Sequence, residues 1–550
     1  MPSTALAFGE TSKPQKVGND FSVTLGGPVY LPRLYDGRNK TFFFGTYEGF
    51  RFPLGSLDQE VVPTDAMRGG DFSAIATPGK PLMNPFTGTP YQNNTLPSGS
   101  VTAASQQFLT LFPHPTSANQ SAPFGSVPNY ITNKDNSYNS DQYDLRGDQY
   151  IGHKASTFAR YTWKSIDQKQ PNQLLVPSSD FIDQYNILVT SFSYNFRPTL
   201  LNEFRFGFTL AKYGSTNAFD GPGFAKKVGL SGVGPDFPFN GVTELDFSGA
   251  TTNLGADRLD NLYKSRTFQF NDNLSWTKGR HSMKYGFDIR GIEAITPLGF
   301  YGADNYGTFG FNGQFTNYDF ADFLLGLPSN TEIDVVKQDN DGQTHHFHLF
   351  GQDTFQVSPH LTLTYGLRWE YHPAYHDPSG NIGNFDPRVP RSGAVIYPDG
   401  AASLLAPGFL ADFNACPTLG SNQRPSVNSA PCTPVLSNSQ AHLPSGLRTA
   451  FKRRFMPSFG FAYRPAIRGG FGVYNITLLG RNFYSLTGTL QSDTRIFQNI
   501  ESSSGPAYQW PAINAGGSGL GAPAYGTAYF GTANDIDWKD SYSMQWNLLG

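Results

Sequence analysis

The sequence predicts an all-β protein whose strands form a transmembrane antiparallel β-barrel. Three observations support this fold class: apolar and polar residues alternate over strand-length stretches, the stretches pair through short turns, and long polar connections separate the pairs. Strands that cross a bilayer need such alternation because lipid-facing and interior-facing side chains follow one another. Helices would repeat their apolar residues about every 3.6 positions instead.

Composition agrees with a barrel. The 550 residues include 59 glycines, 47 phenylalanines and 28 tyrosines, whereas only 15% are charged, against about 25% in soluble globular domains. Aromatic strands suit a lipid-facing surface, although soluble β-sandwiches also contain many aromatic residues. The formal net charge of −3 provides no basic excess, so nucleic acid is not expected as a partner.

The sequence also indicates how the chain could span a membrane and where the predicted barrel begins. No apolar run reaches the ~18 residues that a membrane-spanning helix needs, so any spanning element must be a strand. Residues 1–18 lack a charged segment followed by an apolar stretch, and no secretory signal peptide is visible. We expect residues 1–18 to be a short leader, the remnant of a region before the barrel, and residues 19–550 to form a partial barrel.

Hairpins with apolar residues at alternate positions recur along the chain. They lie around residues 143–163, 188–210, 268–289, 347–371 and 459–473. In the clearest hairpin, the apolar positions after the turn are Leu361, Leu363, Tyr365, Leu367, Trp369 and Tyr371. The intervening positions include Thr362, Thr364, Arg368 and Glu370. Asp272 interrupts the apolar positions of the third hairpin and is the main exception to the pattern.

Connection lengths alternate between short and long. Tight turns are expected near 152–155, 197–199, 277–280, 358–360 and 464–466, and long segments near 52–140, 214–262, 291–343, 373–455 and 476–540. Outer-membrane barrels have short periplasmic turns and long extracellular loops, whereas compact soluble domains rarely contain several loops of this length. The alternation therefore favours a barrel over a β-sandwich, with about 13 strands up to Gly550.

Charged residues fall on the interior positions of the predicted strands. They are Glu203, Arg205, Lys284, Asp288, Arg290, Arg368 and Glu370. We interpret them as the polar lining that a wide barrel interior requires. Pairing across strands and contact with a solute are the other roles open to them.

No catalytic site, cofactor or metal is predicted. The sequence lacks a nucleophile elbow, a phosphate-binding loop and a His-Glu-x-x-His motif, so we expect a protein that is not an enzyme. His345, His346 and His348 lack a carboxylate or cysteine at ligand spacing, and we interpret them as polar interior wall. The segment 339–342 is similar to the start of a calcium loop but lacks the later Glu, which favours a loop turn.

The two cysteines are expected to form a disulfide. Cys416 and Cys432 lie in a stretch rich in Pro, Ser and Asn, with no His pair nearby that would indicate zinc. An exported loop meets an oxidising periplasm, which favours pairing over the alternative of two free thiols.

Six blocks of the sequence resemble the Oar-like branch of TonB-dependent outer-membrane receptors, in the order typical of that family. They are Phe21–Val29 with Lys40–Gly49, Val62–Ser73, Asp272–Gly286, Ala321–Pro328, Leu361–Tyr371 and Ile467–Gly472. The resemblance implies a location in the outer membrane of a Gram-negative-type bacterium. It also implies a barrel of about 22 strands, of which about 13 are in this chain, occluded by an N-terminal plug that contacts the inner-membrane TonB complex.

The matched blocks begin at the first barrel strand, so we expect the plug and its TonB-contacting segment to lie upstream of Met1. The leading functional hypothesis is import of a bulky solute of glycan or peptide class. The alternatives are a surface-exposed binding or adhesion barrel without active transport, and a soluble secreted β-sandwich. The expected partners are outer-membrane lipid, the TonB complex through the plug, and the solute.

Overall fold

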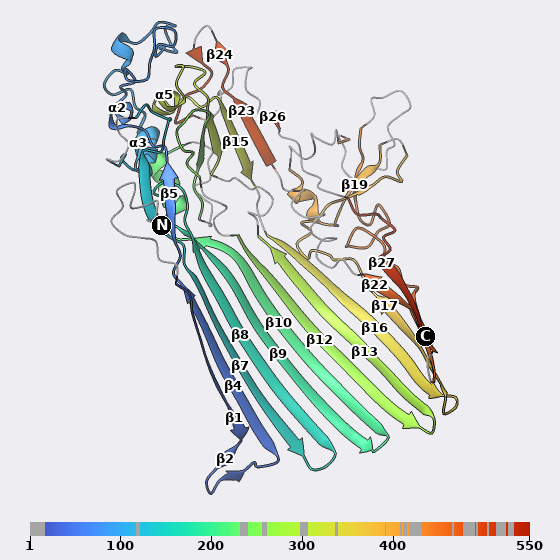
Figure 1. The fold of residues 1–550 in the computed structure, drawn as a ribbon. Helices are drawn as coiled ribbons and strands as arrows, with labels where there is room; N and C mark the ends of the chain where they lie inside the picture. The colour runs from blue at the N-terminus through green and yellow to red at the C-terminus, as the bar shows by residue number, and fades with distance from the viewer. Residues whose placement is uncertain are drawn as a thin grey trace.

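One antiparallel sheet of 13 strands dominates the computed structural model (Figure 1). The structure describes residues 17–116, 122–230, 240–255, 261–297, 306–335, 339–390, 392–406, 410, 415–416, 432–464, 467–476, 490, 493–502, 505–512, 524–525 and 533–550. Within these residues, no helix is both long and apolar enough to span a membrane. The predicted all-β fold and its number of strands are confirmed.

Each strand of this sheet pairs with the strand of the same sheet that follows it in the sequence. The strands are β1 (Asn19–Pro28), β4 (Thr41–Phe52), β7 (Tyr138–Ile151), β8 (Ala155–Gln170), β9 (Ser179–Arg197), β10 (Leu200–Asn217), β12 (Asn261–Lys278), β13 (His281–Thr296), β16 (Asn340–Gln356), β17 (Leu361–Tyr371), β21 (Arg454–Tyr463), β22 (Ile467–Ile476) and β27 (Ser541–Leu549). With 19 residues, β9 is about twice as long as a strand needs to be to cross a bilayer.

Tight turns join neighbouring strands at the predicted positions and gather at one end of the sheet (Figure 1). The hairpin β12–β13 turns at Gly279, whose φ of +57° is a conformation that favours glycine, and β7–β8 turns at Gly152 with φ +59°. The short pair β2 (Tyr30–Leu31) and β3 (Tyr35–Asp36) lies at the same end. Of the predicted turn at 464–466, residues 465–466 lie outside the described residues.

The two faces of the sheet differ in chemistry, as the alternation predicts. On β16, Leu349 is 54% exposed, whereas the neighbouring His348 is 5% exposed. We call the face that carries Leu349 the outer face and the face that carries His348 the inner face. Asp272 lies on the outer face, where its carboxylate accepts a hydrogen bond from Asn202 Nδ2 (2.6 Å) on β10, so this exception to the apolar pattern has a polar partner.

Long connections form folded structure at the other end of the sheet (Figure 1). The larger part, which we call the main lobe, contains a five-stranded sheet of β11 (Glu244–Phe247), β14 (Thr308–Phe311), β15 (Asn330–Val335), β23 (Asp493–Gln498) and β26 (Ala524–Tyr525). Around it lie β5 (Gly55–Glu60), β6 (Tyr130–Asp135), α2 (Asp65–Arg68), η1 (Gln92–Asn94), α3 (Ala103–Leu109), α4 (Gly221–Val228), α5 (Asp319–Leu324), β24 (Glu501–Ser502) and β25 (Gly505–Pro506).

The main lobe has its own hydrophobic core, which the sequence analysis does not anticipate. Aromatic side chains from four separate connections meet there, among them Phe72, Phe108, Phe112, Phe247, Phe320, Phe323 and Trp510. These segments were expected to be polar loops because their apolar residues follow no strand or helix period. The structure shows that the apolar residues instead pack with one another across long sequence separations.

A smaller lobe contains β18 (Asn384–Asp386), β19 (Ala394–Tyr397), β20 (Val435–Ser437) and η4 (Ala401–Leu404). Ile396 and Leu436 are buried in its core together with Ile536, which comes from the segment just before β27. A disulfide joins Cys416 and Cys432, with 5.0 Å between the two Cα atoms.

One sequence interpretation is wrong in this region. The segment 339–342 was expected to be a loop turn, but β16 already begins at Asn340. Asn340 pairs with Thr296 and Asp341 with Ile295, so the backbone of this segment continues the sheet.

Candidate functional site

A cluster of buried and half-buried polar side chains lies on the inner face of β13, β16, β17 and β21, close to the smaller lobe. We call it the inner cluster. It comprises His346, His348, His372, Asp288, Glu370, Asp540, Arg290, Arg368 and Arg454. Side chains alternate along a strand, so residues two apart share a face, and this places most members of the cluster on the inner face. Strand register then aligns Asp288 with His348, and His348 with Glu370.

The three histidines are packed against one another. His346 and His348 lie on β16, and His372 directly follows β17. The Nε2 atoms of His348 and His372 are 2.8 Å apart, and the ring centroids of His346 and His372 are 4.4 Å apart. The three side chains can each offer a ligand atom, and these atoms all lie within 4.8 Å of one another. His345 belongs to the opposite face of the strand and is exposed.

Each carboxylate of the inner cluster is paired with an arginine. Arg290 Nε donates to Asp288 (2.8 Å), and Arg368 Nε donates to Glu370 (2.5 Å). Arg454 Nη1 donates to Asp540, and both of these side chains are almost fully buried. A buried charge without a partner costs several kcal/mol, so the pairing explains how so many ionised groups are accommodated on this face.

Carboxylates and arginines also contact the imidazoles. His372 Nδ1 lies 2.8 Å from Asp540 Oδ2 and 3.0 Å from Arg454 Nη1. His348 Nδ1 lies 3.3 Å from Asp288 Oδ1 and 2.9 Å from Arg368 Nη2. The pKa of Asp540 lies well below its usual range: burial opposes this shift, but the hydrogen bond from His372 and the charge of Arg454 outweigh it.

The structure brings only some of the predicted interior charges into this cluster. Asp288, Arg290, Arg368 and Glu370 belong to it. Glu203 and Arg205 form a separate ion pair on β10 (2.7 Å between Oε1 and Nη2). Lys284 is exposed on β13, nearer the tight turns.

Sequence reasoning missed His372, Arg454 and Asp540. His372 has the same parity as Arg368 and Glu370, so continuing the alternation by one step past β17 would have found it. Asp540 is 168 residues from His372, and no local pattern connects the two. Along the chain, no carboxylate lies at ligand spacing from the histidines. In the fold, carboxylates reach them from neighbouring strands and from the segment before β27.

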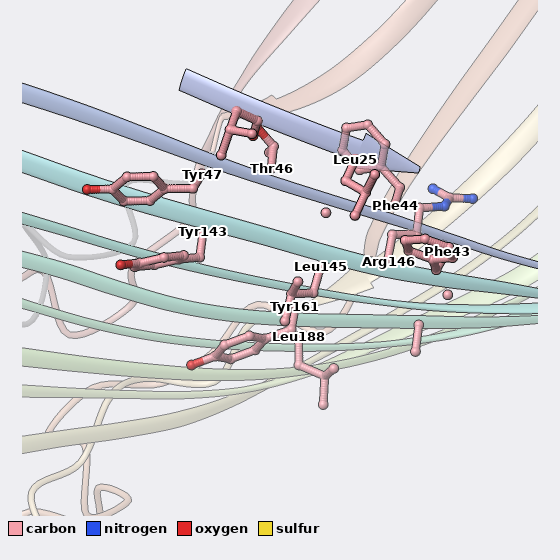
Figure 2. A pocket seen from close by; sticks show the side chains of 14 residues that line it. Leu25, Phe43, Phe44, Thr46, Tyr47, Tyr143, Leu145, Arg146, Tyr161 and Leu188 are labelled. Atoms are coloured by element: carbon pink, nitrogen blue, oxygen red, sulfur yellow. The ribbon is translucent and has the colours of Figure 1, made fainter. Parts of the chain in front are cut away.

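A separate apolar pocket of about 610 Å³ lies on the outer face (Figure 2). It forms where the small residues Gly45, Gly147 and Ala159 leave a depression across β4, β7 and β8. Its walls are mainly Leu25, Phe43, Tyr143, Leu145, Tyr161 and Leu188. The pocket is therefore part of the exposed apolar outer face, on other strands than the inner cluster.

Comparison with known proteins gives one family match. A family model described as an outer membrane beta barrel domain matches residues 3–549. No curated protein matches the sequence.

Comparison with solved structures gives several matches of low identity. The outer membrane transporter YddB from Escherichia coli is 8% identical with a TM-score of 0.40, and the match covers 88% of this chain and 45% of that one. The siderophore receptor PirA from Acinetobacter baumannii is 7% identical with a TM-score of 0.35, covering 86% of this chain and 42% of that one. The copper transporter OprC is 10% identical with a TM-score of 0.32, covering 89% and 52%. This chain spans about half the length of these proteins.

Proposed function

Because the chain belongs to the outer membrane beta barrel domain family, and its place is therefore the outer membrane, we propose that it forms part of the wall of a transporter that imports a bulky solute. The observation that carries this proposal is the opposite chemistry of the two faces of the sheet. Apolar side chains cover the outer face, whereas ion pairs and histidines cover the inner face. Polar walls of this kind line the interior of wide barrels, where polar solutes pass.

The proposed mechanism is binding and conformational change, without covalent chemistry. In line with the resemblance to Oar-like receptors, a plug would occlude the interior and the TonB complex would supply the energy to move it. A glycan or a peptide is the proposed solute class, because both offer many hydrogen-bonding groups to the arginines and carboxylates of the inner face.

A second candidate is a surface receptor that binds a glycan or another cell without transport. The main lobe favours it: the long connections form a structure with its own aromatic core, so a stable recognition surface is available at that end of the sheet. The two functions share binding and differ in whether the solute enters the cell.

Uptake measurements separate them. Cells with and without the gene would be incubated with fluorescent oligosaccharides and oligopeptides too large for general porins, with TonB-depleted cells as the control for energy coupling. We expect periplasmic accumulation only when both the gene and TonB are present. Binding at the surface that depends on the gene, without accumulation, would support the receptor; equal accumulation in all strains would contradict transport.

A further inference from the structure

We propose that His346, His348 and His372 bind a divalent transition-metal ion, a role that goes beyond the proposed transport function and does not depend on it. Side chains from two paired strands converge, with their ligand atoms all within 4.8 Å. The exposed fractions of the three residues are 2%, 5% and 7%. Imidazole nitrogen is the commonest protein ligand of such ions, and here three imidazoles share one buried position.

The contact between His348 and His372 is a hydrogen bond in which one Nε2 donates and the other accepts, and a metal ion could take the place of the shared hydrogen. Their Nε2 atoms are 2.8 Å apart. Two protonated nitrogens would repel each other at this distance, and so would two lone pairs. Either one proton lies between the two atoms, or both lone pairs face the same metal ion, and a metal ion can therefore replace the shared proton.

Distances in the cluster suit a particular class of metal. Imidazole nitrogens bind transition metals at about 2.0 Å, so two of them 2.8 Å apart subtend about 90° at a shared ion. Right angles are typical of Cu²⁺ and Ni²⁺ in tetragonal sites, whereas Zn²⁺ prefers a tetrahedron. Ligands of one ion can be at most ~4.2 Å apart, and the three ligand atoms already lie within 4.8 Å of one another, so a slight side-chain rotation is enough for all three to reach one ion.

Further groups are placed to support the ion. Asp540 contacts His372 Nδ1 at 2.8 Å, and Asp288 lies 3.3 Å from His348 Nδ1. The Asp540 carboxylate, which is nearer to His372 Nδ1 than Arg454 is, can hold a proton on that atom and orient Nε2 toward the metal. At His348, Arg368 Nη2 (2.9 Å) is nearer to Nδ1 than Asp288 is. Glu370 Oε2 lies 3.5 Å from His372 Nε2 and can serve as a fourth ligand.

Charge balance decides which ions the site accepts. Three carboxylates are each offset by one guanidinium, in the pairs Asp288–Arg290, Glu370–Arg368 and Asp540–Arg454. The cluster consequently has no excess negative charge to attract Ca²⁺ or Mg²⁺, which prefer oxygen ligands. Binding has to come from the strength of the metal–nitrogen bonds, for which Cu²⁺ ranks highest among divalent first-row ions.

Copper titration tests the site. The native protein would be purified in detergent without a polyhistidine tag and titrated with Cu²⁺, with binding followed by calorimetry and by electron paramagnetic resonance. We expect one Cu²⁺ per chain, with hyperfine splitting from imidazole nitrogens. His372→Ala should weaken binding at least tenfold, and Asp540→Asn by about 10- to 100-fold. His345→Ala, on the opposite face of β16, is the matched control and should bind as the native protein does.

Two results would overturn the proposal. One is a native protein that binds no stoichiometric Cu²⁺ or shows no nitrogen splitting, a measurement that does not depend on the folding of any variant. The other is a folded His372→Ala or His348→Ala protein that binds Cu²⁺ as tightly as the His345→Ala control.

Discussion

At the scale of single residues, burial decides what the ionisable groups of this protein do. Local alternation was enough to predict that Asp288, Arg290, Arg368 and Glu370 face inward, because a strand places every second side chain on one face. It could not predict that Asp540 would contact His372, since that contact depends on how the segment before β27 folds back over the sheet. The sequence therefore predicted that six of the nine residues of the inner cluster face inward, and it missed His372, Arg454 and Asp540.

Asp322 provides a test of burial in the main lobe. Its side chain is fully buried in α5 and accepts hydrogen bonds from the backbone N–H (2.8 Å) and the hydroxyl (2.6 Å) of Thr316. Burial raises the pKa of Asp322 to about 7, although these hydrogen bonds oppose the shift. Burial likewise raises the pKa of Glu60, in the same lobe, to about 7.

A carboxyl group whose pKa is higher in the folded state than in the unfolded state stabilises the fold while it is protonated. These two groups should therefore contribute most to the free energy of unfolding of the lobe below about pH 4. Their contribution is lost as the pH rises through about 7. Urea unfolding at pH 5 and pH 8 measures the loss. Asp322→Asn should show a smaller pH dependence than the native protein, with Glu60 supplying the remainder; an unchanged dependence would contradict the assignment.

At the scale of elements, hairpins were predictable and lobes were not. Turns such as 277–280 lie between two strands of clear period, so local sequence sets both the strands and the register of the hairpin. The lobe core joins Phe72, Phe108, Phe320 and Trp510 from different connections, and no local period marks such residues. Their contacts form only after the sheet has brought the connections together.

Strand orientation can be tested on β17. Leu367 is 49% exposed near the middle of this strand, whereas Thr364 faces inward, where its hydroxyl lies 3.3 Å from that of Thr354. Leu367→Arg should disfavour membrane insertion by about 2–4 kcal/mol, and Thr364→Arg should have a mild effect. The amount of folded protein recovered from outer membranes measures both. The reverse order would mean that the two faces are inverted.

The disulfide of the smaller lobe is testable by mass. Cys416 and Cys432, 16 positions apart, are bonded beside the bridge between Ala415 and Thr433. Closing a loop of this length restrains the unfolded segment by about 3 kcal/mol, an effect local to the lobe. Exported protein alkylated without reductant should gain no label. Gain of two labels would show that the thiols are free in the cell.

At the scale of the whole molecule, a 13-stranded sheet separates two ends of different structure (Figure 1). Tight turns lie at one end and the lobes at the other. Within the described residues, β1 and β27 each pair on one side only. Backbone groups at such edges need hydrogen-bond partners in lipid, because water is absent there. The alternation of short and long connections along the chain predicts this arrangement, with tight turns at one end of the sheet and long connections at the other.

Labelling of cysteines from outside intact cells tests the membrane topology, on which the whole account depends. Ser98→Cys lies on an exposed connection of the main lobe, and Thr277→Cys is exposed beside the tight turn of β12 and β13. The native cysteines are paired and should not react. In the native outer membrane, a membrane-impermeant maleimide should label Ser98→Cys in intact cells and label Thr277→Cys only after the membrane is permeabilised. Equal labelling of both positions in intact cells, or labelling of Thr277→Cys alone, would contradict the account.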